Sequence, residues 1–169
     1  MHYACHRGSL SILQLLLKYG GDVHSTSKNG VTCLHLACAS GNLDIVRYLL
    51  DEHNFDCSVK STASGTQPIH AATNAGHIHV VKYLIEERGV NPKDEDRNEE
   101  NCLTLAIKNR KRAVALMLVQ LNVFPLDQII PRRGFNYFAY ALVKGQQVVA
   151  NEIFKVLGMK GKSSQDVLN

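Results

Sequence analysis

Five cysteines are the side chains of this sequence best suited to covalent or metal chemistry: Cys5, Cys33, Cys38, Cys57 and Cys102. A zinc site needs thiolates in closely spaced pairs such as C-x-x-C, and the chain has no such pair. Their odd number argues against a disulfide framework. No general base or glycine-rich loop accompanies any of them, as a nucleophile would require. We therefore expect reduced thiols, most of them packed as small apolar side chains.

Histidines form the second group with potential chemistry. His2, His35 and His70 recur at nearly equal intervals, and imidazoles bind zinc at about 2.1 Å. If the interval marks successive structural units, the rings stand about 10 Å apart, as packed helices do, so one ion cannot reach them all. His77 and His79 lack the i, i+4 spacing that places two ligands on one helix face. We expect no metal site, and we expect His77 and His79 to lie in solvent at a helix start.

Positive charge gathers toward the end of the chain. The sequence has 19 Lys and Arg against 15 Asp and Glu, but residues 101–169 hold ten against three. The densest run is Lys-Asn-Arg-Lys-Arg at residues 108–112, and Arg132, Arg133 and Lys144 follow it. Such residues either form a docking site for an acidic segment or make a solvated rim without a partner. A nuclear-import signal at residues 108–112 is a further interpretation.

The elements that position these residues come from an internal repeat. Five alanines share one motif position, at spacings of 33, 35, 34 and 35 residues: Ala4, Ala37, Ala72, Ala106 and Ala141. Eight, twelve and thirteen residues after each alanine the sequence is apolar in every copy. A helix buried on one face has this pattern, and a period of this length predicts a stack of repeated units.

Each copy is predicted to hold two antiparallel helices, which only stacking on neighbours can bury. Residues suited to capping or opening the first helix precede it in four copies: Thr32, Gln67, Asn101 and Asn136. Pro68 then takes the first helical position, where a missing N–H has no cost. Glycines suited to a left-handed turn end the first helix in four copies: Gly8, Gly41, Gly76 and Gly145. Arg110 stands in this place in the fourth copy.

Two stretches resemble the ankyrin repeat, whose motif is Gly-x-Thr-Pro-Leu-His-x-Ala-Ala. They are Gly-Val-Thr-Cys-Leu-His-Leu-Ala-Cys at residues 30–38 and Gly-Thr-Gln-Pro-Ile-His-Ala-Ala at residues 65–72. The resemblance implies an all-α solenoid of stacked helix pairs with short β-hairpin or loop fingers, and histidines that hydrogen-bond near the helix starts. The repeats are expected at 1–26, 27–61, 62–95, 96–130 and 131–158, before a polar tail at 159–169. Because the chain begins inside its first motif, we expect it to be a piece of a longer array.

The resemblance also implies a module that binds another protein and has neither catalytic activity nor a cofactor. Hairpin tips and the ends of the first helices line the concave face of ankyrin repeats. The residues expected to contact a partner there are Arg7, Lys28, Asn74, Arg97, Glu100, Lys108, Asn109, Arg132, Arg133, Phe135 and Lys144. We expect an acidic or phosphorylated segment across the third to fifth repeats, with Phe135 as an apolar anchor.

Two alternatives stay open. In the first alternative, the basic repeats bind nucleic acid or an anionic membrane surface, although the interleaved aromatic residues and base-reading motifs of nucleic-acid-binding proteins are lacking. Otherwise the chain is the targeting domain of a larger enzyme or secreted effector whose catalytic part lies elsewhere. No run of about 18 apolar residues is present, as a membrane-spanning helix requires. We expect a monomer in the cytoplasm or nucleus, or in a host cytosol if the protein is a secreted effector.

Overall fold

A computed structural model of the chain describes residues 1–158, and the predicted polar tail at 159–169 lies outside the described residues. Within this range the secondary structure is entirely helical apart from one isolated β-bridge, between Ile129 and Asn136. The prediction of an all-α solenoid is confirmed. No helix of the described range is long and apolar enough to cross a membrane. The helices are α1 (His2–Arg7), α2 (Leu10–Lys18), α3 (Cys33–Ser40), α4 (Leu43–Glu52), α5 (Pro68–Ala75), α6 (Ile78–Glu86), α7 (Cys102–Lys108), α8 (Arg112–Gln120), α9 (Tyr137–Val143) and α10 (Gln147–Val156).

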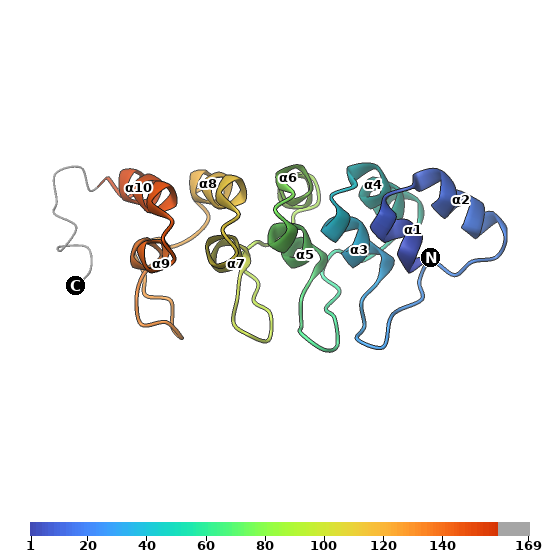
Figure 1. The fold of residues 1–169 in the computed structure, drawn as a ribbon, viewed down its shortest axis with the longest axis horizontal. Coiled ribbons are helices and arrows are strands. Elements are labelled where there is room, and N and C mark those ends of the chain that lie inside the picture. Colours follow the sequence, from blue (N-terminus) through green and yellow to red (C-terminus); the bar gives the residue numbers. More distant parts are fainter. Residues whose placement is uncertain (159–169) are drawn as a thin grey trace.

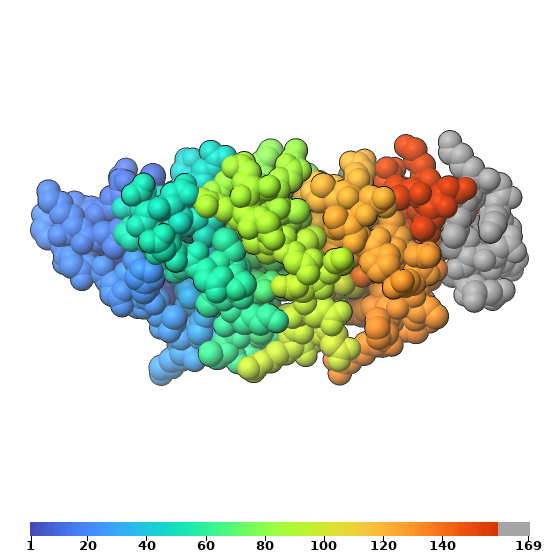
Figure 2. All heavy atoms as spheres, turned by 180° about the vertical axis from the view of Figure 1, so that it is seen from behind, coloured from blue at the N-terminus to red at the C-terminus, as the bar shows by residue number. Residues whose placement is uncertain are grey.

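The helices form five consecutive pairs, here called units one to five, and each predicted repeat range contains one pair. From α3 onward the first helices of the units lie in one layer and the second helices in another, with long hairpin loops extending from the first layer (Figure 1). Figure 2 shows the units following one another along the long axis in sequence order. Each unit therefore packs mainly on its immediate neighbours, as expected of a solenoid.

The predicted helix boundaries are confirmed. Asn101 and Asn136 cap α7 and α9 by accepting a hydrogen bond from the third helical N–H, at 3.0 Å in each case. Gly41 ends α3 with a φ of 75°, in the left-handed region that residues with a Cβ avoid. Arg110 adopts the same conformation in unit four, with a φ of 55°. The left-handed turn between the two helices is therefore present in unit four even though arginine stands in the place of glycine.

The repeated apolar positions form one continuous core. The residues twelve positions after the motif alanine are fully buried in units two to five: Leu49, Leu84, Leu118 and Ile153. Unit one differs, because Ile12 and Leu16 are 53% and 38% exposed, and so it departs from the predicted burial. The second helices of units two to five contact one another, and α2 lies at the end of the described stack (Figure 1).

Side chains at the start of the second helices connect units two, three and five to the unit before them. Asn42 Nδ2 donates to the Gly8 carbonyl at 2.6 Å, and His77 Nε2 donates to the Ala39 carbonyl at 3.0 Å. Gln146 makes the equivalent bond to Ile107. We call these three contacts the backward bonds. The prediction that His77 lies in solvent is wrong, because this bond holds the ring half-buried between two units.

Glycines let the hairpins of units two, three and four approach closely. Gly30 and Gly65 both have positive φ values, and the next hairpin lies directly against them. A Cβ on Gly30 would lie 2.7 Å from the Thr62 nitrogen, and one on Gly65 would lie 3.1 Å from the Arg97 nitrogen. The space that these glycines leave allows backbone hydrogen bonds between hairpins, such as that of Thr62 N–H to the Asn29 carbonyl at 2.9 Å.

Unit four breaks this pattern. Glu99 occupies the place of Gly30 and Gly65, with a φ of 57°. Within residues 1–158 no backbone hydrogen bond joins the hairpins of units four and five. They are joined instead by ion pairs, of Arg132 with Glu99 at 3.4 Å and of Arg133 with Glu100. The stack therefore changes from backbone to side-chain attachment at this joint.

Candidate functional site

A polar groove of about 450 Å³ lies between units three and four. Its walls are the tips of two hairpins and its floor is the ends of α5 and α7. We call it the polar groove, and its lining residues include Ser64, Thr66, His70, Asn74, Asp96, Asn98, Lys108 and Asn109. Three of the predicted contact residues, Asn74, Lys108 and Asn109, are thus brought together at one place.

Two amide side chains form the centre of the polar groove. Asn109 Nδ2 donates to Asn74 Oδ1 at 2.5 Å, and both side chains are exposed. Each amide has four hydrogen-bonding sites, so this bond leaves donors and acceptors available on both residues. The pair can therefore accept from and donate to a ligand while it bridges the two units.

The two hairpin tips beside the groove are held in fixed shapes. Asp96 Oδ1 accepts from the backbone N–H groups of Asn98 at 2.7 Å and Glu100 at 3.0 Å. Ser64 and Thr66 share a hydroxyl–hydroxyl bond of 2.8 Å in the hairpin of unit three. Asp96 was missed by the sequence reasoning, although an Asp two residues before an Asn is typical of such a turn.

Glu100 is a correction to the predicted site. Its side chain is only 2% exposed, so the prediction of a surface contact residue is wrong. Its Oε1 accepts from Lys108 Nζ at 3.0 Å and from Arg133. Burial alone would raise the pKa of this carboxyl, but the hydrogen bonds from Lys108, Thr104 and Arg133 together outweigh burial and lower the pKa below its usual value. Glu100 is therefore a buried anion that fixes two of the predicted cations.

Tyr140 contacts three of the predicted residues of unit five. The Arg133 guanidinium carbon lies 4.5 Å from the centre of its ring, and Lys144 Nζ lies 5.7 Å from it. The ring of Phe135 stacks on Tyr140 with 6.5 Å between centroids and stays 37% exposed. The position of Tyr140 is aromatic or apolar in every unit, so its contacts with cations could not be predicted from the repeat.

The other predicted contact residues lie apart from the polar groove or beside it. Arg132 is exposed and pairs with Glu99, as described above. Arg97 Nη1 donates to the Ala63 carbonyl at 3.1 Å. Arg7 bonds the Tyr3 hydroxyl in unit one, and Lys28 is exposed at the hairpin of unit two.

The predicted basic cluster is divided by the fold. Lys108 and Arg133 lie on Glu100 near the polar groove. Arg110 and Arg112 instead line a separate cavity of about 410 Å³, with residues 145–148 of unit five. The run at 108–112 thus contributes to two different surfaces.

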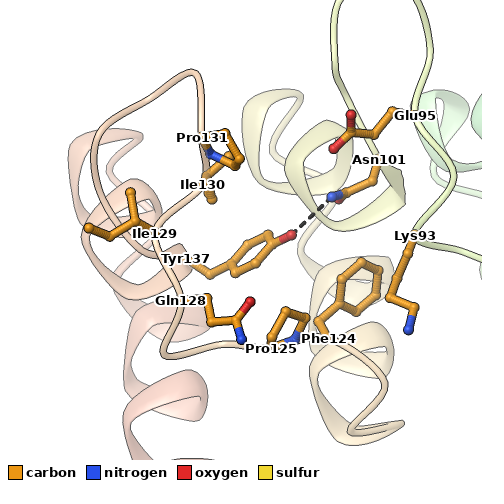
Figure 3. A pocket seen from close by; sticks show the side chains of 10 residues that line it. All are labelled: Lys93, Glu95, Asn101, Phe124, Pro125, Gln128, Ile129, Ile130, Pro131 and Tyr137. Atoms are coloured by element: carbon orange, nitrogen blue, oxygen red, sulfur yellow. Dashed lines mark hydrogen bonds between the residues drawn. The ribbon is translucent and has the colours of Figure 1, made fainter.

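A third cavity, of about 210 Å³, lies between the hairpins of units four and five (Figure 3). Phe124, Pro125, Ile129 and Tyr137 give it apolar walls, and Tyr137 is held by a 2.9 Å hydrogen bond from Asn101 Nδ2. The sequence reasoning did not find this cavity, because the loop that forms it matches no motif position.

Two of the motif cysteines, Cys38 and Cys102, lack the properties of nucleophiles. Cys38 and Cys102 are fully buried. Burial raises the pKa of the Cys102 thiol to about 12, and it also raises that of Cys38. Neither thiol is ionised near neutral pH, and the thiolate is the reactive form.

The motif histidines are structural. In unit three, His70 Nδ1 accepts from the Gln67 N–H at 3.0 Å and Nε2 donates to the Asp94 carbonyl at 2.9 Å. In unit two, His35 Nε2 donates to the Thr66 carbonyl at 2.9 Å. Burial is the main cause that lowers the pKa of both imidazoles. The two rings therefore connect their own units to the next hairpin in the neutral form.

These lowered pKa values predict that the stack is destabilised by mild acid. Above a pH of about 6.5 the histidines are neutral in both states, and below it the unfolded chain takes up protons first. The free energy of unfolding should therefore fall as the pH decreases from about 7.5 to about 5. Urea denaturation should show that the free energy of unfolding falls less with acid in His70→Gln than in the original chain. In His79→Gln, where the replaced side chain is exposed, the free energy of unfolding should fall as much as in the original chain. An equal fall in all three proteins would contradict the assignment.

Comparison with known proteins places the sequence among repeat proteins. A family model described as ankyrin repeats (three copies) matches residues 1–96 and 54–129. Protein phosphatase 1 regulatory subunit 27 of Mus musculus is 46% identical over 50 residues, which cover 30% of this chain and 32% of that protein. The Notch-regulated ankyrin repeat-containing protein of Xenopus tropicalis is 33% identical over 58 residues, which cover 34% of this chain and 51% of that protein. The likeness thus covers about a third of the first relative and half of the second.

Proposed function

This chain belongs to the ankyrin-repeat family, a family of protein-interaction modules, and we propose that its polar groove binds an extended segment of a partner protein. The observation that carries the proposal is the exposed Asn74–Asn109 pair at the floor of a groove between two fixed hairpin tips. Side-chain amides and hydroxyls are suited to the N–H and C=O groups of an extended polypeptide.

The lining of the polar groove indicates the extended shape of the partner segment more directly than its charge. An acidic or phosphorylated segment is the partner that the sequence predicted, and this stays a prediction. Lys108, Arg132 and Arg133 each pair with a carboxylate of the chain itself, which an acidic partner would have to displace. Phe135 remains available as an apolar anchor at the next unit. The groove is therefore better suited to a polar segment with one apolar side chain than to a strongly acidic one.

The relatives support a role in binding without catalysis. By its name, one of them is a regulatory subunit of protein phosphatase 1, and a regulatory subunit acts by binding another protein. We propose a non-catalytic module, and an enzyme activity would have to come from sequence outside these repeats.

Blocking the polar groove should abolish most of the binding. In Asn74→Arg with Asn109→Arg, two long cations fill the space between the hairpin tips, and we expect roughly tenfold weaker affinity for a groove ligand. The ligands would be peptides selected from a random library on the unchanged chain, measured by isothermal titration calorimetry.

The matched control is Gln14→Arg with Asn151→Arg, which adds the same charge at exposed positions of α2 and α10, away from the groove. The control should bind like the unchanged chain. Selected peptides that bind the groove variant as tightly as the control would contradict the proposal.

A further inference from the structure

We propose that the turn between α7 and α8 is a second docking surface, which receives an acidic segment of a partner protein. We call it the basic turn, and it consists of Arg110, Lys111 and Arg112. It opens on the cavity of about 410 Å³ that Arg110 and Arg112 share with residues 145–148. This surface is separate from the polar groove and does not depend on it.

The charge of the basic turn is not neutralised within the described residues. Within residues 1–158 none of its three cations forms an ion pair, whereas Lys108 and Arg133 share the Glu100 carboxylate. Arg110 and Arg112 are also exposed. Free cations next to a cavity raise the local concentration of anionic groups, and cations already paired do not.

The turns that neighbour the basic turn lack acidic residues. The equivalent turns of units three and five, residues 75–79 and 144–148, contain no Asp or Glu. The nearest acidic residue in an equivalent turn is Asp44 of unit two. The positive field of the basic turn therefore extends over the adjoining units without an opposing charge.

The opposite wall of the cavity adds hydrogen-bond donors. The Gln146 side chain makes the backward bond to Ile107, is only 8% exposed and does not cap α10. The N–H groups of Gln147 and Val148 in the first turn therefore lack an acceptor from within the helix. The arginines carry the proposal, and these N–H groups are compatible with a carboxylate in the cavity.

The dimensions favour a carboxylate-bearing peptide over a nucleic acid. Two guanidinium groups at one cavity can bind one or two carboxylates through paired hydrogen bonds. A nucleic acid needs a longer row of phosphate contacts and aromatic side chains for stacking, and no aromatic residue lines this cavity. The basic turn is therefore suited to an acidic peptide segment.

The test is a titration of the ¹⁵N-labelled chain with a peptide of about ten residues that carries several glutamates, at low salt. We expect saturable shifts of the Gln147 and Val148 amides. In Arg110→Gly with Arg112→Gln the affinity should fall roughly fivefold. Glycine suits the φ of 55° at residue 110, so we expect the melting temperature of the variant not to fall. Measuring that temperature would check that the fold is kept.

Three controls locate the effect. The same peptide with glutamine in place of glutamate should not bind. Arg132→Gln, which removes an exposed cation elsewhere, and the polar-groove variant Asn74→Arg with Asn109→Arg should keep the affinity. The last result separates this inference from the proposed function, because each surface then fails or succeeds alone.

Three outcomes would overturn the proposal. One is equal affinity of the unchanged chain and the basic-turn variant. Another is shifts centred on Arg133 or Asn74 instead of Gln147 and Val148. The third is tighter binding of a short single-stranded DNA than of the peptide at about 0.15 M salt, lost in the same variant, which would make the basic turn a nucleic-acid surface.

Discussion

Replacing Gly41 by alanine should lower the free energy of unfolding by about 3 kcal/mol. The left-handed φ of 75° accounts for about 1–2 kcal/mol of this loss, because a Cβ is crowded there. The remainder comes from His77, because the new Cβ would overlap its imidazole ring. That ring cannot move away without losing its backward bond to Ala39. Urea denaturation followed by circular dichroism would measure the loss.

Two further variants divide this effect into its two causes. Gly89→Ala has a similar φ of 65° but no neighbouring atom within 4 Å, so it should lose only the backbone part. Gly41→Ala combined with His77→Ala should be less destabilised than the sum of the two single variants, since one change makes room for the other. Equal losses at Gly41 and Gly89, or strict additivity, would mean that His77 does not pack on the turn as described.

The second large effect is expected at the buried carboxylate. Arg133→Met should keep the packing on Tyr140 but leave Glu100 with Lys108 as its one charged partner. Breaking a fully buried ion pair costs about 3–5 kcal/mol. Since Arg133 is 24% exposed and Lys108 remains, we expect about 2 kcal/mol. Arg132→Met breaks the exposed pair with Glu99 and should cost less than about 0.5 kcal/mol.

The same variant should change the response to acid. The pKa of Glu100 is lowered in the folded chain, so its stabilisation is present above the unfolded value and is lost as the pH falls through the folded one. Without Arg133 the folded pKa rises, and the loss should begin at a higher pH. Urea midpoints between about pH 7 and about pH 3 would show this shift, and Glu100→Gln with Arg133→Met should abolish it. If Arg133→Met lost stability at the same acid pH as the original chain, Arg133 would not stabilise the Glu100 carboxylate.

These variants also separate structural cations from cations that are available to a partner. Replacing Arg132 and Arg133 together by Glu would break the ion pair of Arg133 with Glu100 and also remove any contact of the two arginines with a partner protein. Weaker binding of the partner would then have two explanations. A change at Arg132 alone avoids that ambiguity, since its pair with Glu99 is exposed.

The fold could be predicted because its signals are local and repeated. Asn101 and Asn136 cap helices through contacts within three residues, and the turn at Gly41 is set by backbone conformation alone. Even Arg110 was expected at a turn, because the other units have glycine there. Buried positions such as Leu84 recur at constant offsets, so five copies support each assignment.

The site was less predictable because it depends on contacts between units. Whether Glu100 is exposed depends on Arg133, which is 33 residues away on the next hairpin. His77 has polar neighbours in the sequence, and only the carbonyl of Ala39 in the preceding unit explains its burial. The Glu100 pairing leaves no periodic pattern, because it occurs where unit four departs from the repeat, with Glu99 in the place of a glycine. The backward bonds recur at one repeat position, but their residue types differ: Asn42, His77 and Gln146.

The backward bonds have a mechanical consequence. They cross the joints between units one and two, two and three, and four and five. In unit four the equivalent residue is Lys111, whose side chain lies against Gly76 and, within residues 1–158, makes no such bond. The second helix of unit four therefore lacks this restraint on unit three, and the two units are joined by their hairpins and by the Asn74–Asn109 bond instead. Because the polar groove spans that joint, a small change in curvature there would alter the width of the groove.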